Sequence, residues 1–269
     1  MPPTLVRTMS PSLARVPVSA LGPGPRHPGD AEADAGLVTP LTIFPAGSVR
    51  LWLRWTSVLL GTPPAIATAA DQSGLGNDGT QGTVADRPTL VDGVGMDFDG
   101  ATDHLTVADH ASLDLTTAMT IGLRVRFDTV AADQVVLSKG PTTGGSWALQ
   151  MVGSQNRLWV RFGAGGMPNY GRLSAFSAAT WYSLIIRLYG AGATNALRLR
   201  AWVNGTEDGG IAYTSTIPSS MAVTTDPVVV GRWADAAQRL NGQLRAVVIS
   251  DVAADAGQIA ALTSYLNGC

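Results

Sequence analysis

From Arg50 onward the chain consists of short segments in which apolar and polar residues alternate. Every second residue is apolar in MTIGLRVRFD (119–128), and in RLWVRFG (157–163) the same spacing places Leu158, Val160 and Phe162 on one face. Successive side chains of a strand point to opposite faces, so this alternation predicts half-buried β-strands. Similar segments follow, separated by Gly, Asn, Asp and Pro: SLIIRLYG, ALRLRAWVNG with its Val-Asn-Gly turn, PVVVGRW and GQLRAVVIS. The pattern predicts an all-β, antiparallel two-sheet sandwich of the jelly-roll kind.

The two ends of the chain depart from this alternation. In DAGQIAALTSYL (255–266), Ile259, Leu262 and Leu266 share one face of a helix, which predicts a short C-terminal helix. Nine of the 16 prolines lie in residues 1–47. Proline removes backbone donors and glycine loosens the chain, so we expect an extended N-terminal arm at 1–47 and one jelly-roll domain at 48–269. Such an arm is suited to lying on neighbouring subunits.

Composition limits the classes of partner. The chain has 269 residues, of which 45% are hydrophobic and 14% charged, and its formal net charge is −2 with dispersed basic residues. This balance favours a globular core and argues against nucleic acid or an anionic membrane surface as partner. Arg54 and Pro63-Pro64 interrupt the most apolar stretch, and the N-terminus lacks an apolar run, so neither a membrane-spanning helix nor a secretory signal is expected. The single cysteine, Cys269, excludes an intrachain disulfide.

The order of the segments is informative as well. LWLRW is followed by DQSGLGNDGT, RPTLVDGVGMDFDGATDHLTV, AMTIGLRVRF, VVLSKG with SWALQM, TWYSLIIRLYG with LRLRAWVNG, PVVVGRW, and LNGQLRAVVISDVAADAGQIAAL. Over about residues 50–266 this succession resembles the laminin-G-like, concanavalin A-like jelly-roll superfamily. The resemblance implies two packed antiparallel sheets, one of them concave, with loops at the rim. Members include lectins, accessory modules of carbohydrate enzymes, adhesive domains, bacteriophage virion proteins and some glycoside hydrolases.

The most acidic stretch, MDFDGATDHLTVADHASLDL (96–115), holds five Asp and two His. An EF-hand loop begins with Asp and needs glycine at its sixth position. In a loop that begins at Asp97, Gly100 is at the fourth position. We therefore interpret Asp99, Gly100 and Asp103 as turn residues, and His104 as a solvent-facing strand residue. In the resembled family an F-D-G segment often binds structural calcium together with an acid on a late strand. Arg245 stands where that acid is expected, so we expect no metal site and no cofactor.

The sequence lacks the local catalytic motifs of the common hydrolases, and a Ser-His-Asp arrangement stays open because its members need not be adjacent in sequence. Enzymes of the resembled fold usually carry their carboxylates on one strand as E-x-D-x-x-E, but the only glutamates are Glu32 and Glu207. No G-x-S-x-G nucleophile elbow is present, and the glycine-rich loop GPTTGGS (140–146) lacks the lysine of a phosphate loop. We therefore predict that the chain is not an enzyme and has no catalytic residues.

Tryptophan and arginine occupy the polar positions of two predicted strands. Trp159 and Arg161 point away from the apolar face of their strand, and Trp202, Arg200 and Arg198 do so in theirs. Tryptophan faces stack on sugar rings and arginine supplies a fixed fork of donors. If the strands are neighbours in the concave sheet, Trp159, Arg161, Arg200 and Trp202 form a carbohydrate-binding face. The alternative is that these side chains cover an exposed sheet or lie in a subunit interface.

Three functions are weighed from these observations. The first is a structural and binding module of a larger assembly, a bacteriophage virion protein in capsid decoration or tail, anchored through residues 1–47 and homo-oligomeric. Its location would be the virion, assembled in the host cytoplasm. The second is a lectin-like module that binds cell-surface glycan. The third is a glycoside hydrolase.

Overall fold

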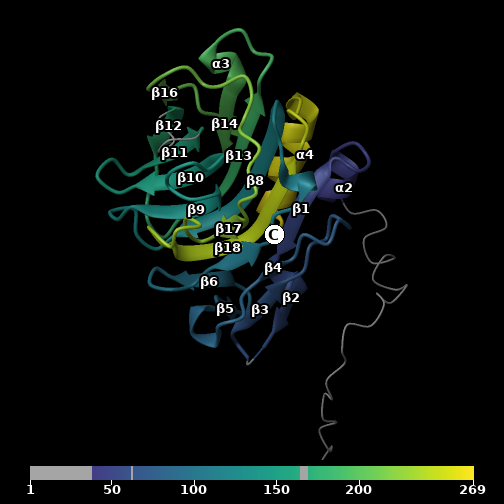
Figure 1. Ribbon diagram of the computed structural model, residues 1–269, viewed down its shortest axis with the longest axis vertical. Helices are drawn as coiled ribbons and strands as arrows, with labels where there is room; N and C mark the ends of the chain where they lie inside the picture. Colours follow the sequence, from purple (N-terminus) through teal and green to yellow (C-terminus); the bar gives the residue numbers. More distant parts are fainter. Residues whose placement is uncertain (1–37, 62, 164–168) are drawn as a thin grey trace, which may run out of the picture. The chain divides into compact units, whose positions relative to one another are not determined.

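The computed structural model describes residues 38–61, 63–163 and 169–269, which form one compact unit beginning at Val38. Within it two antiparallel β-sheets pack face to face, and a C-terminal helix lies beside them (Figure 1). This architecture confirms the predicted jelly-roll sandwich with its short C-terminal helix. The predicted arm falls outside the described residues as far as residue 37.

The first sheet has eight strands among the described residues. In spatial order they are β15 (Thr206–Glu207), β14 (Leu199–Val203), β13 (Trp181–Tyr189), β8 (Ala118–Phe127), β18 (Asn241–Ser250), β6 (Gly95–Asp99) and β5 (Thr89–Val91), with β1 (Val49–Arg54) pairing with β18.

The second sheet has ten strands among the described residues. Their order is β16 (Ala212–Tyr213), β12 (Asn169–Ala175), β11 (Arg157–Phe162), β10 (Trp147–Val152), β9 (Gln134–Lys139), β17 (Val228–Val230), β7 (Leu105–Val107), β4 (Gly79–Thr80), β3 (Ile66–Ala69) and β2 (Val58–Leu60).

Short helical segments connect or flank the strands. They are α2 (Pro40–Ile43), the 3₁₀ turns η1 (Trp55–Ser57), η2 (Val84–Asp86) and η3 (Ala111–Leu113), the single turn α3 (Asn195–Arg198), and α4 (Ala256–Asn267). Asp255 caps α4 by accepting from the Gln258 backbone N–H, while the Gln258 side chain accepts from the Asp255 N–H. None of the helices in the described part of the chain has the length and apolar character needed to cross a membrane.

The main core lies between the two sheets and follows the predicted alternation. On β8, Met119, Ile121, Leu123, Val125 and Phe127 are all fully buried. Facing strands contribute further aromatic side chains to the same cluster, among them Trp147 of β10 and Phe162 of β11. The alternation in the sequence therefore predicted correctly which face of these strands is buried.

A second, smaller cluster lies on the outer face of the first sheet, under α4. Ile259, Leu262 and Leu266 pack there against Trp52, Ile185 and Val248 together with Phe44. Gly122 of β8 permits this close approach, since a Cβ at that position would come within 2.9 Å of Leu262 Cδ2. The helix therefore covers part of the sheet and leaves the rest of that face open.

Two boundaries differ from the predicted ones. The compact unit begins at Val38 rather than at residue 48, because α2 packs on α4 and Phe44 joins the cluster beneath it. The strand expected to include Leu197 and Arg198 begins only at Leu199. Residues 195–198 form the turn α3, where the Arg198 guanidinium donates to the carbonyls of Gly192 and Ile217.

Candidate functional site

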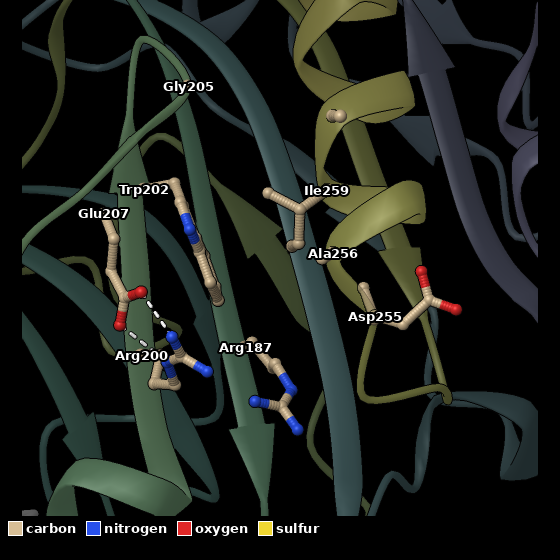
Figure 2. Close-up of a pocket in the computed structure, with 10 residues that line it drawn as sticks. Arg187, Arg200, Trp202, Gly205, Glu207, Asp255, Ala256 and Ile259 are labelled. Carbon is tan, nitrogen blue, oxygen red and sulfur yellow. Dashed lines mark hydrogen bonds and ion pairs between the residues drawn. The ribbon is translucent and has the colours of Figure 1, made fainter.

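A groove of about 380 Å³ lies on the outer face of the first sheet. Its lining comes from three places (Figure 2): strands β13 and β14, the β14–β15 hairpin, and the first turns of α4. The lining residues are Arg187, Arg200, Trp202, Gly205, Glu207, Ala254, Asp255, Ala256, Ile259 and Ala260. Its volume falls in the range of about 300–1,000 Å³ that small-molecule sites occupy.

The β14–β15 hairpin sets the positions of the polar lining residues. Asn204 and Gly205 form a two-residue turn, with φ of 51° and 83°, which closes the pairing of Val203 with Thr206. Both angles are positive, as the hairpin turns that match strand twist require. This register places Trp202 opposite Glu207 and confirms the Val-Asn-Gly turn expected from the sequence.

Arg200 and Glu207 form a two-pronged ion pair at one side of the groove. Arg200 Nε donates to Glu207 Oε1 at 2.6 Å, and its Nη2 donates to Oε2. The hydrogen bond from Arg200 holds the pKa of Glu207 below its usual range, and Glu207 raises the pKa of Arg200 in return. The Arg200 guanidinium also lies 5.2 Å from the centroid of the Trp202 ring. Trp202 is therefore fixed beside a pair of charged, hydrogen-bonding groups.

Arg187 lies directly opposite Arg200 across the β13–β14 pairing. Its guanidinium lies 5.2 Å from the centroid of the Tyr189 ring. Within the described residues it makes no ion pair, and its buried Nε has no hydrogen-bond partner. Burial lowers the pKa of Arg187, and the positive charge of Arg200 lowers it further. The groove thus contains a guanidinium that forms no ion pair within the described chain, although the charge of Glu207 acts on it from a distance.

The opposite wall of the groove is apolar. Ile259 and Ala256 project from the first turns of α4 toward the Trp202 ring (Figure 2). The groove therefore offers one aromatic wall, one aliphatic wall and charged groups along the strands, a combination suited to a small polar ligand with an apolar face.

The other predicted pair, Trp159 and Arg161, lies on β11 in the second sheet. Trp159 stacks on Tyr170 with ring centroids 4.1 Å apart and planes 9° apart. The Arg161 guanidinium lies 4.8 Å from the Trp159 centroid and 5.2 Å from that of Tyr170. One face of the Trp159 ring is therefore already occupied by a protein side chain.

The four predicted binding residues do not form one face. Strands β11 and β14 belong to different sheets, and their polar sides both point away from the core between the sheets. The premise that the two strands are neighbours is wrong because alternation shows which face a residue occupies but not which strand lies beside it. Arg200 and Trp202 line the groove, whereas Trp159 and Arg161 form a separate aromatic cluster with Tyr170.

The acidic stretch forms a turn, as predicted. Asp99 Oδ1 accepts from the backbone N–H groups of Ala101, Thr102 and Asp103, at 2.8, 2.9 and 3.1 Å. Burial acts to raise the pKa of Asp99, but these N–H groups outweigh it and hold the pKa below its usual value. The carboxylate therefore serves the backbone of the turn.

His104 is not solvent-facing, which corrects the prediction made from its alternation with Leu105 and Val107. Its side chain is buried, and a ring nitrogen lies 2.7 Å from Gln81 Nε2. Strand β7 begins only at Leu105, so the alternation does not extend back to His104. Burial lowers the pKa of His104.

Arg245 stands where the resembled family places an acid. It donates to the carbonyls of Gly93, Val94 and Cys269, at 2.8, 2.6 and 2.9 Å. Its guanidinium also lies 4.5 Å from the centroid of the Trp181 ring. Arg245 thus joins the turn before β6 to the end of the chain. Among the described residues, no group of three or more His, Cys, Asp or Glu side chains is arranged to hold a metal ion.

Replacing Asp103 with asparagine should remove a pH-dependent loss of stability. Burial and the neighbouring carboxylates of Asp99 and Asp97 raise the pKa of Asp103 from 3.8 to about 7. Because the folded state holds this proton more tightly than the unfolded state, stability falls as the pH rises from about 4 to about 7. We expect Asp103→Asn to increase the free energy of unfolding at pH 8 by on the order of 2 kcal/mol, and to change it little at pH 4. Urea unfolding at the two pH values measures the difference.

The matched control for this prediction is Asp92→Asn, which changes an exposed carboxylate in the turn before β6. It should leave stability unchanged at both pH values. His104, whose pKa is lowered, destabilises the fold as the pH falls, but it is present in every variant and cancels in the comparison. Equal stability of Asp103→Asn and the unchanged protein at pH 8 would contradict the prediction.

The fold and groove define a β-sandwich of the lectin-like class. Residues 99–260 match the family described as the Concanavalin A-like lectin/glucanases superfamily. The match covers more than half of the chain, and the chain belongs to this superfamily. A search of the curated proteins found no match.

Solved structures of known proteins share the fold at low sequence identity. A Trypanosoma rangeli sialidase in complex with 2,3-difluorosialic acid matches 87% of this chain and 37% of its own, with a TM-score of 0.58 and 13% identity. Botulinum neurotoxin type C, whose cell entry depends on interaction with two ganglioside molecules, matches 81% of this chain and 51% of its own, with a TM-score of 0.56 and 12% identity. The binding domain of botulinum neurotoxin DC, in complex with SialylT, has a TM-score of 0.53 and 12% identity. The chain thus spans only about a third to a half of the length of these proteins, and the likeness shows the fold.

The prediction that the chain is not an enzyme is wrong. Strong structural matches are sialidases, and the superfamily itself includes glucanases. The reasoning failed because it tested for a carboxylate pair on one strand, whereas some glycosidases, sialidases among them, use a tyrosine nucleophile. The absence of one catalytic motif does not separate this chain from the enzymes that share its fold.

Sequence reasoning missed three residues near the predicted site residues. Arg187 occupies a polar position of SLIIRLYG and could have been found by the same alternation that identified Arg200. Glu207 was considered only in the search for a catalytic carboxylate pair, although a two-residue turn at Asn204-Gly205 brings it beside β14. Tyr170 has no signal of its own, because its stacking on Trp159 depends on the pairing of β11 with β12.

Proposed function

We propose that this protein binds carbohydrate in the groove between the β14–β15 hairpin and α4. The observation that carries the proposal is the Trp202 ring beside the Arg200–Glu207 ion pair, in a groove of about 380 Å³. An aromatic ring packs against the apolar C–H face of a sugar, and guanidinium and carboxylate groups bond its hydroxyls. The groove supplies both kinds of contact within one small volume.

The known proteins with this fold support the same class of ligand. The botulinum neurotoxin domains are described with gangliosides and with SialylT, and the sialidase with a sialic acid derivative. These ligands are carbohydrates, and the superfamily is named for lectins and glucanases. The support is for carbohydrate as the ligand class, because identity of 11–13% does not carry individual contacts over to this chain.

Replacing Trp202 with alanine should weaken glycan binding by at least about tenfold, because it removes the stacking surface. A glycan array identifies ligands of the unchanged protein, and titration calorimetry then compares the variants on those ligands. Trp159→Ala, on the other sheet, is the matched change and should leave affinity unaltered. Loss of binding in Trp159→Ala but not in Trp202→Ala would move the site to the second sheet, and no binding to any glycan by the unchanged protein would reject the proposal.

The narrower role in a bacteriophage virion remains a proposal, and so do the homo-oligomeric state and the virion location. Its support is the resemblance to virion jelly rolls and the proline-rich segment before residue 48. Since Phe44 packs under α4, a truncation that tests the role should end at residue 37 and spare the folded unit. Incorporation of the truncated protein into particles at the normal level would count against anchoring by that segment.

A further inference from the structure

The groove holds two guanidinium groups in different states. Arg200 is engaged by both carboxylate oxygens of Glu207, so its charge is largely compensated within the protein. The Arg187 side chain, one strand away, forms no ion pair with the described residues, and its Nε has no hydrogen-bond partner. From this difference we infer that the groove selects sugars that carry a carboxylate, and that Arg187 is the residue that binds that carboxylate. The inference rests on the proposed function, because it names the ligand class for the same groove.

No other charged group of the lining forms an ion pair with Arg187. Glu207 and Asp255 are the two acids among the lining residues, and they balance the formal charges of Arg187 and Arg200. Glu207 is held by Arg200 and acts on Arg187 only from a distance, and Asp255 Oδ1 accepts from the Gln258 N–H at the start of α4. Figure 2 shows the Asp255 carboxylate turned away from Arg187. Each acid thus has its own structural partner, and Arg187 is the guanidinium of the lining without a hydrogen-bonded carboxylate.

A guanidinium without an ion-pair partner in this position favours an anionic ligand. Burial and the charge of its cross-strand neighbour Arg200 lower the pKa of Arg187, and they outweigh the opposite effects of Tyr189 and Glu207. A carboxylate bound in the groove would give the terminal nitrogens of the Arg187 guanidinium charged acceptors. Guanidinium also matches the planar, two-oxygen geometry of a carboxylate better than that of a single hydroxyl.

The apolar walls restrict the ligand further. A small inorganic anion would leave Trp202, Ala256 and Ile259 without a contact, although all three line the groove. A pyranose ring with a carboxyl substituent places an apolar face and a negative charge a few bonds apart, which fits one aromatic wall and one neighbouring guanidinium. The ligand class is therefore an acidic sugar, of the uronic or sialic acid kind.

The test compares sugars that differ in the carboxylate alone. The probes are N-acetylneuraminic acid with its methyl ester, and galacturonic acid with galactose, titrated into the full chain at low and at physiological salt. In at least one pair the acid should bind about ten- to a hundredfold tighter than its neutral partner. The preference should shrink as salt increases.

Three variants test whether Arg187 causes the preference for the acidic sugar. Arg187→Gln should bring the affinity for the acid down to that for the neutral partner, and Arg187→Lys, which keeps the charge but loses the planar fork, should retain part of the preference. Arg239→Gln, which removes an arginine outside the groove, should retain all of it. Thermal unfolding of each variant verifies that it is folded.

The outcomes separate the inference from the proposed function. Equal affinity for the acid and neutral members, with binding lost in Trp202→Ala, overturns the acidic selectivity and leaves carbohydrate binding in place. An acid preference that survives Arg187→Gln also overturns the assignment to Arg187. Absence of binding to all four probes and to a glycan array overturns both.

Discussion

Replacing Leu262 with alanine should lower the free energy of unfolding by about 3 kcal/mol, within the range of about 2–5 kcal/mol measured for buried leucines. Leu262 is fully buried in the cluster beneath α4, where it lies against Gly122 of β8. Gly122 has no side chain, so the strand at this point cannot fill the space that alanine leaves. The cost should therefore include the cavity as well as the lost burial.

The same substitution should weaken ligand binding without touching the groove. Ile259 and Ala256 line the groove from the helix that Leu262 anchors. Urea unfolding followed by circular dichroism measures the stability change, and calorimetry with the best glycan measures the affinity. Leu59→Ala, at a leucine that is 64% exposed, is the matched control and should stay within about 0.5 kcal/mol. A stability change below about 1 kcal/mol for Leu262→Ala would show that the helix is held by other contacts.

The fold could be predicted from the sequence because its main signals are local. Alternation within β8 and β11 and the helical spacing of Ile259, Leu262 and Leu266 each depend on neighbours in sequence, and the structure places these residues as the patterns indicate. The alternation of apolar and polar residues is less informative at the ends of strands. His104 lies one residue before its strand begins, is buried, and contacts Gln81, a residue distant in sequence. Arg198 lies in a helical turn although its segment alternates like a strand.

The candidate site could be predicted only in part because it depends on strand order. Alternation identified Arg200 and Trp202 as outward-facing residues, and both line the groove. It could not show that β13 pairs with β14, which places Arg187 opposite Arg200, because that pairing is a contact between separate segments. For the same reason Trp159 and Trp202 were predicted to share one binding face, whereas the structure places them on different sheets.

Lys139 is a buried charge that the sequence pattern does not identify. It is the single lysine among the 18 basic residues. The structure places it at the end of β9, with a side chain that is 1% exposed. Its Nζ lies 2.8 Å from Asp109 Oδ1 and 3.3 Å from Asp114 Oδ1, and it donates to the Asp226 carbonyl at 3.0 Å. A compact ammonium group can meet three acceptors that surround it, whereas a planar guanidinium is bulkier and directs its donors differently.

Lys139→Met should therefore lower the free energy of unfolding by about 2–4 kcal/mol. Removing one partner of a fully buried ion pair costs about 3–5 kcal/mol. The expected loss lies slightly lower because the side chains of Asp109 and Asp114 remain 30% and 20% exposed and can regain water. Lys139→Arg, which keeps the charge but not the shape, should also destabilise the protein, by about 1–3 kcal/mol through overpacking. Urea unfolding at neutral pH measures both variants.

A double-mutant cycle with Asp109→Asn distinguishes the ion pair from simple loss of packing. Asp109→Asn alone should cost less than Lys139→Met, because Asp114 and the Asp226 carbonyl still bind the ammonium group. In the double variant Asp109 no longer leaves an unpaired carboxylate and only that of Asp114 remains, so the two costs should sum to more than the measured loss, with a coupling of about 1 kcal/mol or more. Strict additivity would mean that Lys139 and Asp109 are not coupled, and that Lys139 stabilises the fold through Asp114, the Asp226 carbonyl or its aliphatic stem. A sizeable coupling would instead mean that the charge of Lys139 holds the segment after β7 against the end of β9.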